Sequence, residues 1–212
     1  DLVWKYCLPS VMAQTCRNFK WLIYFDRDTP NEYVKIIESY RQSAPMILPR
    51  FIEGMKQLLE SIKNDISTET HHDGIVITSR LDNDDSLHKQ FVEKIQMTIK
   101  KKKIVNGVID IPNGYCLKIK PDFALYSSIQ YSNAFITCIE PFVSNDQLST
   151  VMSRPHPQWA YNVRTYLIKY EKLWMQIIHE KNVVNKAQGR MVDDLKELLP
   201  FNIGVDIRIS KV

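Results

Sequence analysis

The segment that most constrains the fold of this 212-residue chain is GIVITSRLDNDDSL, residues Gly74–Leu87. Ile75–Ile77 is a short β-branched run typical of a strand. Three aspartates follow it closely: Asp82, Asp84 and Asp85. Ser86 then stands where a cap is expected for a helix that carries Phe91, Ile95 and Ile99. The acidic cluster is therefore expected at the carboxyl end of a strand and just before a helix, where open α/β sheets bind their ligands.

The three aspartates favour a metal site. Carboxylates so close together repel one another unless a cation or several N–H donors offset the repulsion. A hard divalent ion with oxygen ligands is the natural partner. The alternative is a polar loop with a helix cap, and we favour the metal because the cluster directly follows an apolar strand.

A second acidic group, Asp26-Arg27-Asp28-Thr29, follows the apolar run Phe19–Asp26, which predicts a buried strand. One interpretation is a carboxylate that binds a nucleotide base or ribose. Another is the DxDxT nucleophile loop of haloacid-dehalogenase-type phosphatases, with Ser79 as the later hydroxyl. LDNDD follows Ser79 too closely to leave room for the lysine and strand of that pattern, so the phosphatase is the alternative. A helix cap at Asp28 and Thr29 is the third possibility.

A histidine and a basic stretch form the third candidate. Leu173–His179, LWMQIIH, predicts a strand that ends in His179. Imidazole beside carboxylates suits Mn²⁺ better than Mg²⁺, although a partly buried structural histidine is the alternative. The polar and basic residues that follow suit diphosphate oxygens, or an exposed loop: Asn182, Asn185, Lys186 and Arg190. His71-His72-Asp73 is better explained as a surface loop, and His156 as a rigid loop residue between prolines.

The remaining pattern predicts an α/β fold with a central, mixed, mostly parallel sheet flanked by helices, and an antiparallel hairpin in the second half. Strand and helix alternate in the first half, whereas the second half carries a hairpin signal at Pro112-Asn113-Gly114. We expect helices from Pro9 in the first turn, from Thr29 as cap with Pro30, and over Phe51–Ile62, Asp146–Met152 and Asp193–Leu199. Further strands are expected over Ile104–Ile111, Tyr115–Ile119 and Asn133–Glu140.

Composition excludes several classes of protein. Hydrophobic residues make up 44% and charged residues 25%, as in a globular domain, so we expect one domain over residues 1–212. A net charge of +4 is too small for a nucleic-acid binder, and the run Lys100–Lys103 fits a solvated helix end. No apolar run reaches the length of a membrane span. Four cysteines without a CxxC pair favour reduced thiols and a cytoplasmic location.

Three blocks of the sequence resemble one enzyme family. CLPSVMAQTCRNFKWLIYFDRDTP looks like the opening of a glycosyltransferase with the GT-A (Rossmann-like) fold. ITSRLDNDDSL is similar to the DxD region of the putative rhamnosyltransferase family, and WMQIIHEKNVVN to its W-L-Q-V-x-H-G-x-N segment. Together the blocks extend from about Cys7 to Asn185. The chain also resembles chlorella-virus glycosyltransferase domains, which for a viral protein would imply the host cytoplasm.

The resemblance implies a role for individual residues. Asp26 would contact the base or ribose, Arg80 would lie beside the nucleotide, and Asp82 would bind the ribose. Asp84 and His179 would hold Mn²⁺ or Mg²⁺. Asp85 would face the donor sugar or support the metal. Asn182, Lys186 and Arg190 would lie near the diphosphate. Residues 1–103 would form the nucleotide-binding half and residues 104–212 the acceptor half, which completes the metal site.

The implied reaction moves a sugar of the rhamnose or glucose type from a nucleotide diphosphate, UDP in the first instance, to a hydroxyl of a glycan acceptor. An inverting reaction needs a carboxylate base, for which Asp146 and Glu140 are candidates by position. A nucleotide-sugar binding module without turnover is a further alternative. Two features depart from the family: Glu180 replaces a glycine, and no strand precedes the first helix.

Overall fold

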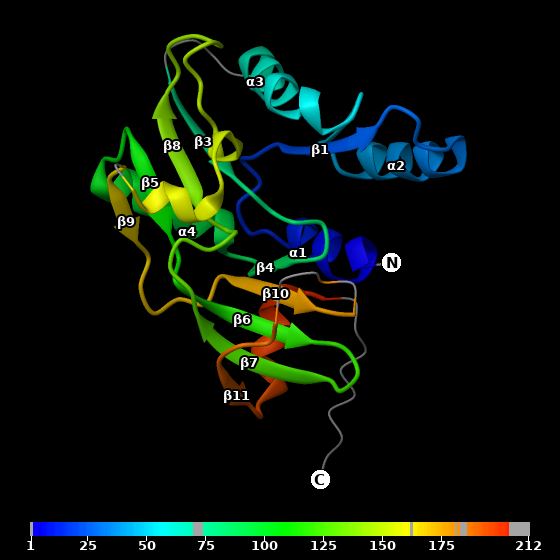
Figure 1. Ribbon diagram of the computed structural model, residues 1–212, viewed down its shortest axis with the longest axis vertical. Coiled ribbons are helices and arrows are strands. Elements are labelled where there is room, and N and C mark those ends of the chain that lie inside the picture. Colours follow the sequence, from blue (N-terminus) through cyan, green and yellow to red (C-terminus); the bar gives the residue numbers. More distant parts are fainter. Residues whose placement is uncertain (1, 70–73, 162, 181, 183–185, 204–212) are drawn as a thin grey trace.

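Three β-sheets with helices packed around them form the part of the chain that the computed structural model describes, residues 2–69, 74–161, 163–180, 182 and 186–203 (Figure 1). A π-helical turn, Val3–Cys7, continues into α1 (Leu8–Met12), with Pro9 in its first turn as predicted. Within the described ranges, no helix is both long and apolar enough to cross a membrane.

The first sheet is a parallel pair joined by a helix. β1 (Trp21–Asp26) and β2 (Ile47–Ile52) run side by side from Trp21 opposite Ile47 to Asp26 opposite Ile52, and α2 (Asn31–Ser43) connects them. β1 is half-buried rather than buried, because its sheet has only two strands.

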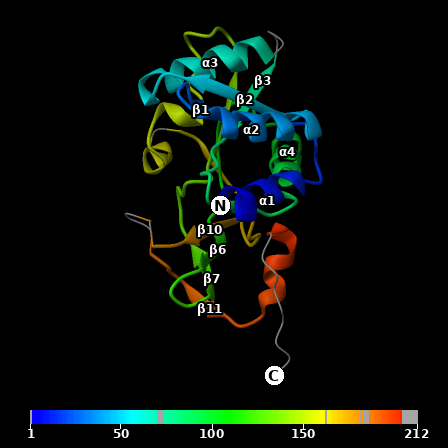
Figure 2. The same ribbon diagram turned by 90° about the vertical axis from the view of Figure 1, so that its right-hand side faces the viewer.

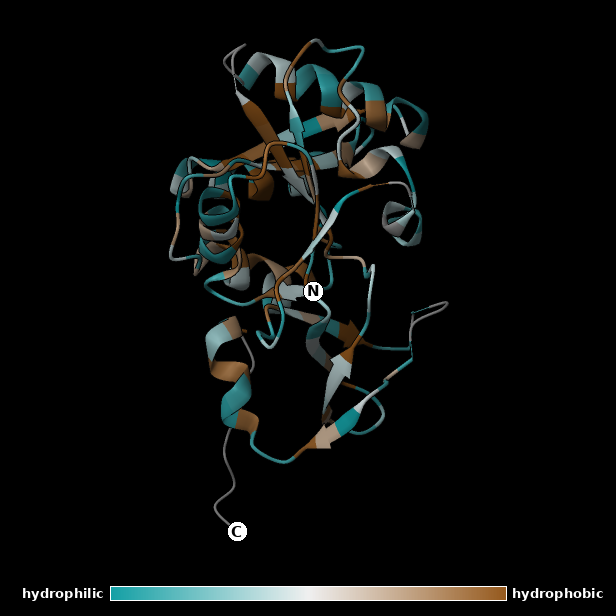
Figure 3. Ribbon diagram, turned by 90° about the vertical axis from the view of Figure 1, so that its left-hand side faces the viewer, coloured by the Kyte–Doolittle hydropathy of each residue, from teal (hydrophilic) through white to brown (hydrophobic). Residues whose placement is uncertain are grey.

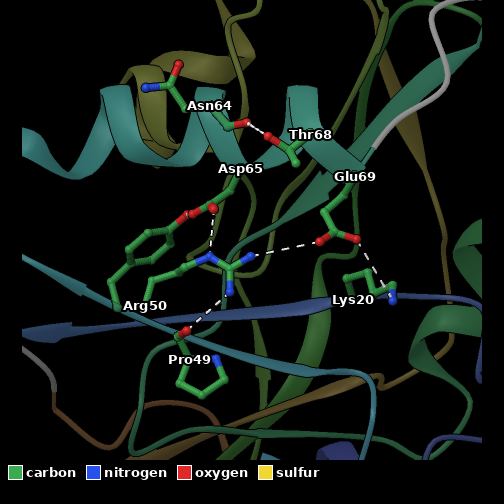
Figure 4. A network of polar contacts seen from close by, with 8 residues as sticks. Lys20, Pro49, Arg50, Asn64, Asp65, Thr68 and Glu69 are labelled. Atoms are coloured by element: carbon green, nitrogen blue, oxygen red, sulfur yellow. Dashed lines mark hydrogen bonds and ion pairs between the residues drawn. The ribbon is translucent and has the colours of Figure 1, made fainter.

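A polar network fastens the next helix to this sheet (Figure 4). α3 (Leu58–Glu69) follows the 3₁₀ turn Met55–Gln57. Arg50 Nε donates to Asp65 at 2.6 Å, and the Tyr24 hydroxyl donates to the same carboxylate at 2.7 Å. Because Arg50 lies on β2 and Tyr24 on β1, one aspartate of α3 holds both strands.

The second sheet has the order β3-β8-β5-β9, with β3 (Ile75–Ser79), β8 (Thr137–Pro141), β5 (Gly107–Asp110) and β9 (Thr165–Leu167). β3 and β5 are both antiparallel to β8, and β9 is parallel to β5. The carboxyl ends of β3, β5 and β9 therefore lie at one edge. α4 (Phe91–Lys102) packs against this sheet through Phe91, Ile95 and Ile99, as predicted.

The third sheet has the order β11-β7-β6-β10-β4. Its strands are β11 (Arg190–Val192), β7 (Ala124–Ile129), β6 (Asn113–Lys118), β10 (Trp174–Ile178) and β4 (Ser86–Leu87). β6 and β10 are parallel, and the other pairs are antiparallel. A 3₁₀ helix, Leu195–Phe201, lies alongside this sheet (Figure 2) and buries Leu198 and Phe201 against Tyr115, Leu117 and Met175. Short 3₁₀ turns cover Val151–Ser153 and His156–Ala160.

The α/β class with mixed sheets and flanking helices is confirmed. In Figure 3 the helices carry both hydrophobic and hydrophilic residues. Parallel pairing is less common than predicted: among the described strands, three pairs are parallel, β1-β2, β6-β10 and β5-β9. The single domain over residues 1–212 and its division at residue 103 stay predictions.

The hairpin around Pro112 is placed differently. β5 and β6, the strands on either side of Pro112, lie in different sheets, and the antiparallel hairpin is instead β6-β7. Gly114 is a strand residue packed under Trp174, since a Cβ there would lie 2.2–2.5 Å from the indole ring. Packing against Trp174, 60 residues away in sequence, therefore decides the conformation of this segment, although its composition predicts a turn.

Several helices and strands also begin or end at residues other than those predicted. Phe51 lies in β2 rather than a helix. Ser86 is a buried residue of β4 whose hydroxyl donates to the Tyr6 carbonyl, so it caps no helix. Thr29 donates to the Asp26 carbonyl and Pro30 precedes α2. Residues 145–147 form a turn in place of the predicted helix.

Candidate functional site

The acidic loop and His179 meet at the carboxyl end of β10. The loop leaves β3 at Ser79 and enters β4 at Ser86, and β4 pairs antiparallel with β10, placing Ser86 opposite Met175. Asp84 Oδ2 lies 3.0 Å from His179 Nε2, although 95 residues separate them in sequence. The His179 side chain is 10% exposed and that of Asp84 21%, so the pair is largely shielded but reachable.

Asp85 points into the protein rather than toward a ligand. Its side chain is buried, and its Oδ1 accepts a hydrogen bond of 2.9 Å from the Ile177 backbone N–H. The β4-β10 ladder ends at Met175, so this carboxyl replaces the missing strand partner of Ile177. Burial raises the pKa of Asp85 well above its usual value, and the charges of Asp84 and Asp82 add to the shift. This burial disfavours the expected contact of Asp85 with the donor sugar and fits the other expectation, that Asp85 supports the metal site from within the protein.

Asp82 is turned toward Arg80. Arg80 Nε and Nη2 both lie 2.9 Å from Asp82 Oδ1, and about a third of each side chain is exposed. Arg80 and Asp82, two of the predicted nucleotide-binding residues, are thus within four residues of Asp84 in sequence and are paired with each other. In the residues that the structure describes, no three metal-binding side chains converge, so the metal-binding role of Asp84 and His179 stays a prediction.

Asn182 holds the turn that carries His179. Its Oδ1 accepts from the His179 backbone N–H at 2.6 Å, and its own N–H donates to the His179 carbonyl at 3.1 Å. Asn182 therefore belongs to the site through His179. Lys186 is exposed on the segment that leads to β11.

Arg190 lies away from His179. The strand register places Arg190 opposite Ser127, Ser127 opposite Tyr115, and Tyr115 opposite Met175. Three strand spacings separate Arg190 from β10, about 14 Å, and Met175 is itself four residues before His179. The register therefore separates Arg190 from His179, and its predicted contact with a diphosphate stays a prediction.

Two lysines that sequence reasoning missed lie at the same end of the sheet. β6 runs parallel to β10, with Lys118 opposite Ile178, and Lys120 Nζ lies 3.0 Å from Glu180 Oε1. Lys120 lowers the pKa of the exposed Glu180 carboxyl. The signal for these residues was the sequence KIK directly after an apolar strand. Both lysines are ion-paired, since Lys118 Nζ also lies 3.8 Å from Asp122 Oδ2.

Asp26 is exposed at the carboxyl end of β1, in a different sheet from the acidic loop. Its Oδ1 accepts from the Asp28 N–H at 2.9 Å, and its carbonyl accepts from the Thr29 hydroxyl at 2.6 Å. Ser79, which the phosphatase alternative requires, shares a 2.7 Å hydrogen bond with Thr137. That contact engages the hydroxyl within the sheet and disfavours the phosphatase.

The two candidate bases, Glu140 and Asp146, lie away from the acidic loop. Glu140 accepts hydrogen bonds from the backbone N–H groups of Ser149 and Thr150 at 2.8 and 2.7 Å, which is a structural role. The exposed Asp146 lies in a turn beyond the end of β8, where the next residue back, Asn145, donates to Asn64 of α3. Because β8 is antiparallel to β3, this turn is at the amino end of β3, away from the acidic loop. This position disfavours the catalytic role predicted for Asp146, which stays untested.

The two remaining histidine candidates have different outcomes. His156 Nδ1 lies 2.6 Å from the Ser132 carbonyl, as expected of a residue held in a rigid loop. Residues 71–73, the predicted surface loop His71-His72-Asp73, lie outside the described residues.

The described geometry offers a carboxylate oxygen and an imidazole nitrogen 3.0 Å apart, and the same loop carries the Arg80–Asp82 ion pair. Carboxylate and imidazole are both ligands that Mn²⁺ accepts. A family model described as putative rhamnosyl transferase matches residues 2–191. No curated protein matches the chain.

Proposed function

We propose that this chain, a glycosyltransferase that belongs to the putative rhamnosyl transferase family, transfers a sugar from a nucleotide diphosphate to a glycan hydroxyl with the help of a divalent ion. The single observation that carries the metal is the approach of Asp84 Oδ2 to His179 Nε2 at 3.0 Å. The GT-A resemblance supports the same interpretation. The donor sugar is of the rhamnose or glucose type, and UDP is the first base to test.

The donor set fits an ion that protein and substrate share. Asp84 and His179 supply one oxygen and one nitrogen, which suits Mn²⁺ better than Mg²⁺. Two protein ligands leave coordination positions for the oxygens of a diphosphate. Both atoms can bind the same ion only if the hydrogen bond between them is given up. When bound, the ion would act as a Lewis acid that offsets the negative charge of the leaving diphosphate.

The chain's own residues would orient the two ligands and add charge. Asp85 anchors the acidic loop to β10 through the Ile177 N–H, and Asn182 fixes the backbone at His179. Lys118 and Lys120 lie at the same end of the sheet and would attract the diphosphate electrostatically if they exchanged their exposed partners, Asp122 and Glu180, for it. Arg80 and Asp82 are exposed enough to exchange their mutual contact for one to the nucleotide. Asp26 would contact the base or ribose.

Calorimetric titration of UDP in the presence of Mn²⁺ and of a chelator tests this proposal. We expect binding that requires Mn²⁺ and is lost in Asp84→Asn, because the amide is a much poorer metal ligand. Asp146→Asn is the matched control, since it removes an exposed aspartate at the other end of β3, and it should bind like the wild type. GDP and dTDP follow if UDP does not bind.

Turnover separates a transferase from a binding module. Release of nucleoside diphosphate from UDP-rhamnose or UDP-glucose should depend on Mn²⁺ and should rise when a glycan acceptor is added. Metal-independent binding of all three nucleotides, or no binding of any, would overturn the proposed site.

A further inference from the structure

A cavity lies at the opposite end of β10 from His179. Its volume is about 290 Å³, and it is lined by His88, Tyr115, Tyr170, Lys172, Glu197, Pro200 and Phe201. Lys172 precedes His179 by seven residues along an extended segment, which corresponds to about 23 Å. The cavity is therefore separate from the acidic loop, and nothing in the proposed transfer step uses its residues.

Two side chains of opposite charge, Lys172 and Glu197, line the cavity and are joined through the Tyr115 hydroxyl. Lys172 Nζ donates to the Tyr115 hydroxyl at 3.0 Å, and that hydroxyl in turn donates to Glu197. The Lys172 ammonium lies 4.6 Å from the centre of the Tyr115 ring, so it is held over the aromatic face. An ammonium has three donors and a carboxylate several acceptor positions, so both groups keep capacity for a ligand.

His88 adds a donor whose tautomer follows from its hydrogen bond. The Gln90 backbone N–H donates to His88 Nδ1 at 3.1 Å, so the proton of the neutral ring is on Nε2. The ring also packs edge-on against Phe201, with centroids 5.6 Å apart. The cavity wall thus combines hydrogen-bonding groups with aromatic surface.

Tyr170 lies at the rim in an unusual conformation. Its side chain is 90% exposed and its φ is +70°, in the left-handed region that a bulky residue rarely adopts. The neighbouring Glu171 is tied to Lys94 by a 2.8 Å ion pair, which fixes the segment from the other side. Strained residues concentrate at ligand clamps, and this one presents an aromatic face to solvent beside polar groups.

We propose that this cavity binds a neutral saccharide, a part of the acceptor glycan that does not react. A sugar ring has an apolar C–H face that would pack on Tyr170 and hydroxyls that would pair with Lys172 and Glu197. An anionic ligand would be repelled by Glu197, and a cationic ligand by Lys172. The inference rests on the proposed function in that it takes the saccharide to be part of the acceptor.

Saturation-transfer NMR without nucleotide or metal tests the site directly. The probes are methyl α-L-rhamnopyranoside, methyl α-D-glucopyranoside and maltotetraose, each up to about 10 mM. We expect at least one of them to bind, and Tyr170→Gly to weaken its binding about tenfold through the loss of the aromatic face. Lys172→Met, which keeps the side-chain stem over Tyr115, should weaken it to a similar degree.

Tyr170→Gly also controls for misfolding. Glycine adopts φ +70° without strain, so the melting temperature should stay unchanged or rise while binding falls. Tyr161→Ala is the matched control, because Tyr161 is also exposed but does not line the cavity, and it should bind like the wild type.

The outcomes separate the two proposals. Saccharide binding together with failure of all nucleotide titrations would keep this site and overturn the transfer site. Absence of saturation transfer from all three probes, or equal transfer in wild type and Tyr170→Gly, would overturn the saccharide site whatever the nucleotide result.

Discussion

Replacing Asp85 tests whether one buried carboxyl aligns the site. In Asp85→Ala the Ile177 N–H loses its 2.9 Å partner at a point where no further residue of β4 can replace it. The loop that carries Asp84 loses its anchor to β10 at the same time. We therefore expect both lower stability and weaker Mn²⁺-dependent nucleotide binding.

The magnitude follows from the burial of that amide. An unsatisfied buried N–H costs about 1–3 kcal/mol. Removal of a buried carboxyl, whose pKa is raised because its charged form is disfavoured, offsets part of that cost. We expect a net loss of about 1–2 kcal/mol in the free energy of unfolding. For a chain of this length, where 1 kcal/mol shifts the melting temperature by about 2–4 °C, the predicted fall is about 2–8 °C.

Asp85→Asn is the matched control, because its amide oxygen can still accept from Ile177. Differential scanning fluorimetry should place its melting temperature near that of the wild type, and calorimetry should show near-normal nucleotide binding. The reasoning is refuted if Asp85→Ala melts like the wild type. It is also refuted if Asp85→Asn keeps its stability but loses nucleotide binding, since that would mean direct contact between Asp85 and the ligand.

Three further predictions address the core, the candidate base Glu140 and the half-buried His88. Gly114→Ala should lower the free energy of unfolding by about 1–3 kcal/mol, because the new methyl overlaps the buried Trp174 ring, and the melting temperature should fall with it. Glu140→Gln should destabilise the protein in thermal melts but leave turnover measurable, and complete loss of turnover in a folded variant would restore Glu140 as the base. Burial lowers the pKa of His88, so the unfolded state takes up the proton first and stability should fall as pH drops below about 6.5; His88→Gln should flatten that dependence in urea titrations at pH 5–7.5.

The central element of the site could be predicted from the sequence. A β-branched run followed by aspartates implies a strand with an acidic loop at its carboxyl end, and both strand and loop are found. His179 likewise follows an apolar strand. That these two loops meet could not be deduced from periodicity, because the contact depends on β4 pairing with β10. The resemblance to a family provided that link.

The distinct roles of the three aspartates could not be read from the sequence. Asp82, Asp84 and Asp85 have the same chemistry, yet one pairs with Arg80, one with His179 and one with a backbone N–H. The difference arises because β4 has only two paired residues and leaves Ile177 to be satisfied by a side chain.

Long-range pairing explains the other errors. Pro112-Asn113-Gly114 has the composition of a hairpin turn, but Trp174 needs the space above Gly114, so the segment becomes a strand beside β10. The cavity at Tyr115 brings together Lys172 and Glu197, which lie 57 and 82 residues away in sequence. No local pattern marks such a site.

The most direct measurement of the central claim is pulsed electron paramagnetic resonance of Mn²⁺ bound together with UDP. Coupling to a histidine ¹⁴N nucleus and to the diphosphate ³¹P nuclei should both be present in the wild type. His179→Gln should lose the ¹⁴N coupling and keep the ³¹P coupling if any nucleotide–metal complex still binds. A wild-type spectrum with ³¹P but no ¹⁴N coupling would contradict the assignment of His179 as a metal ligand.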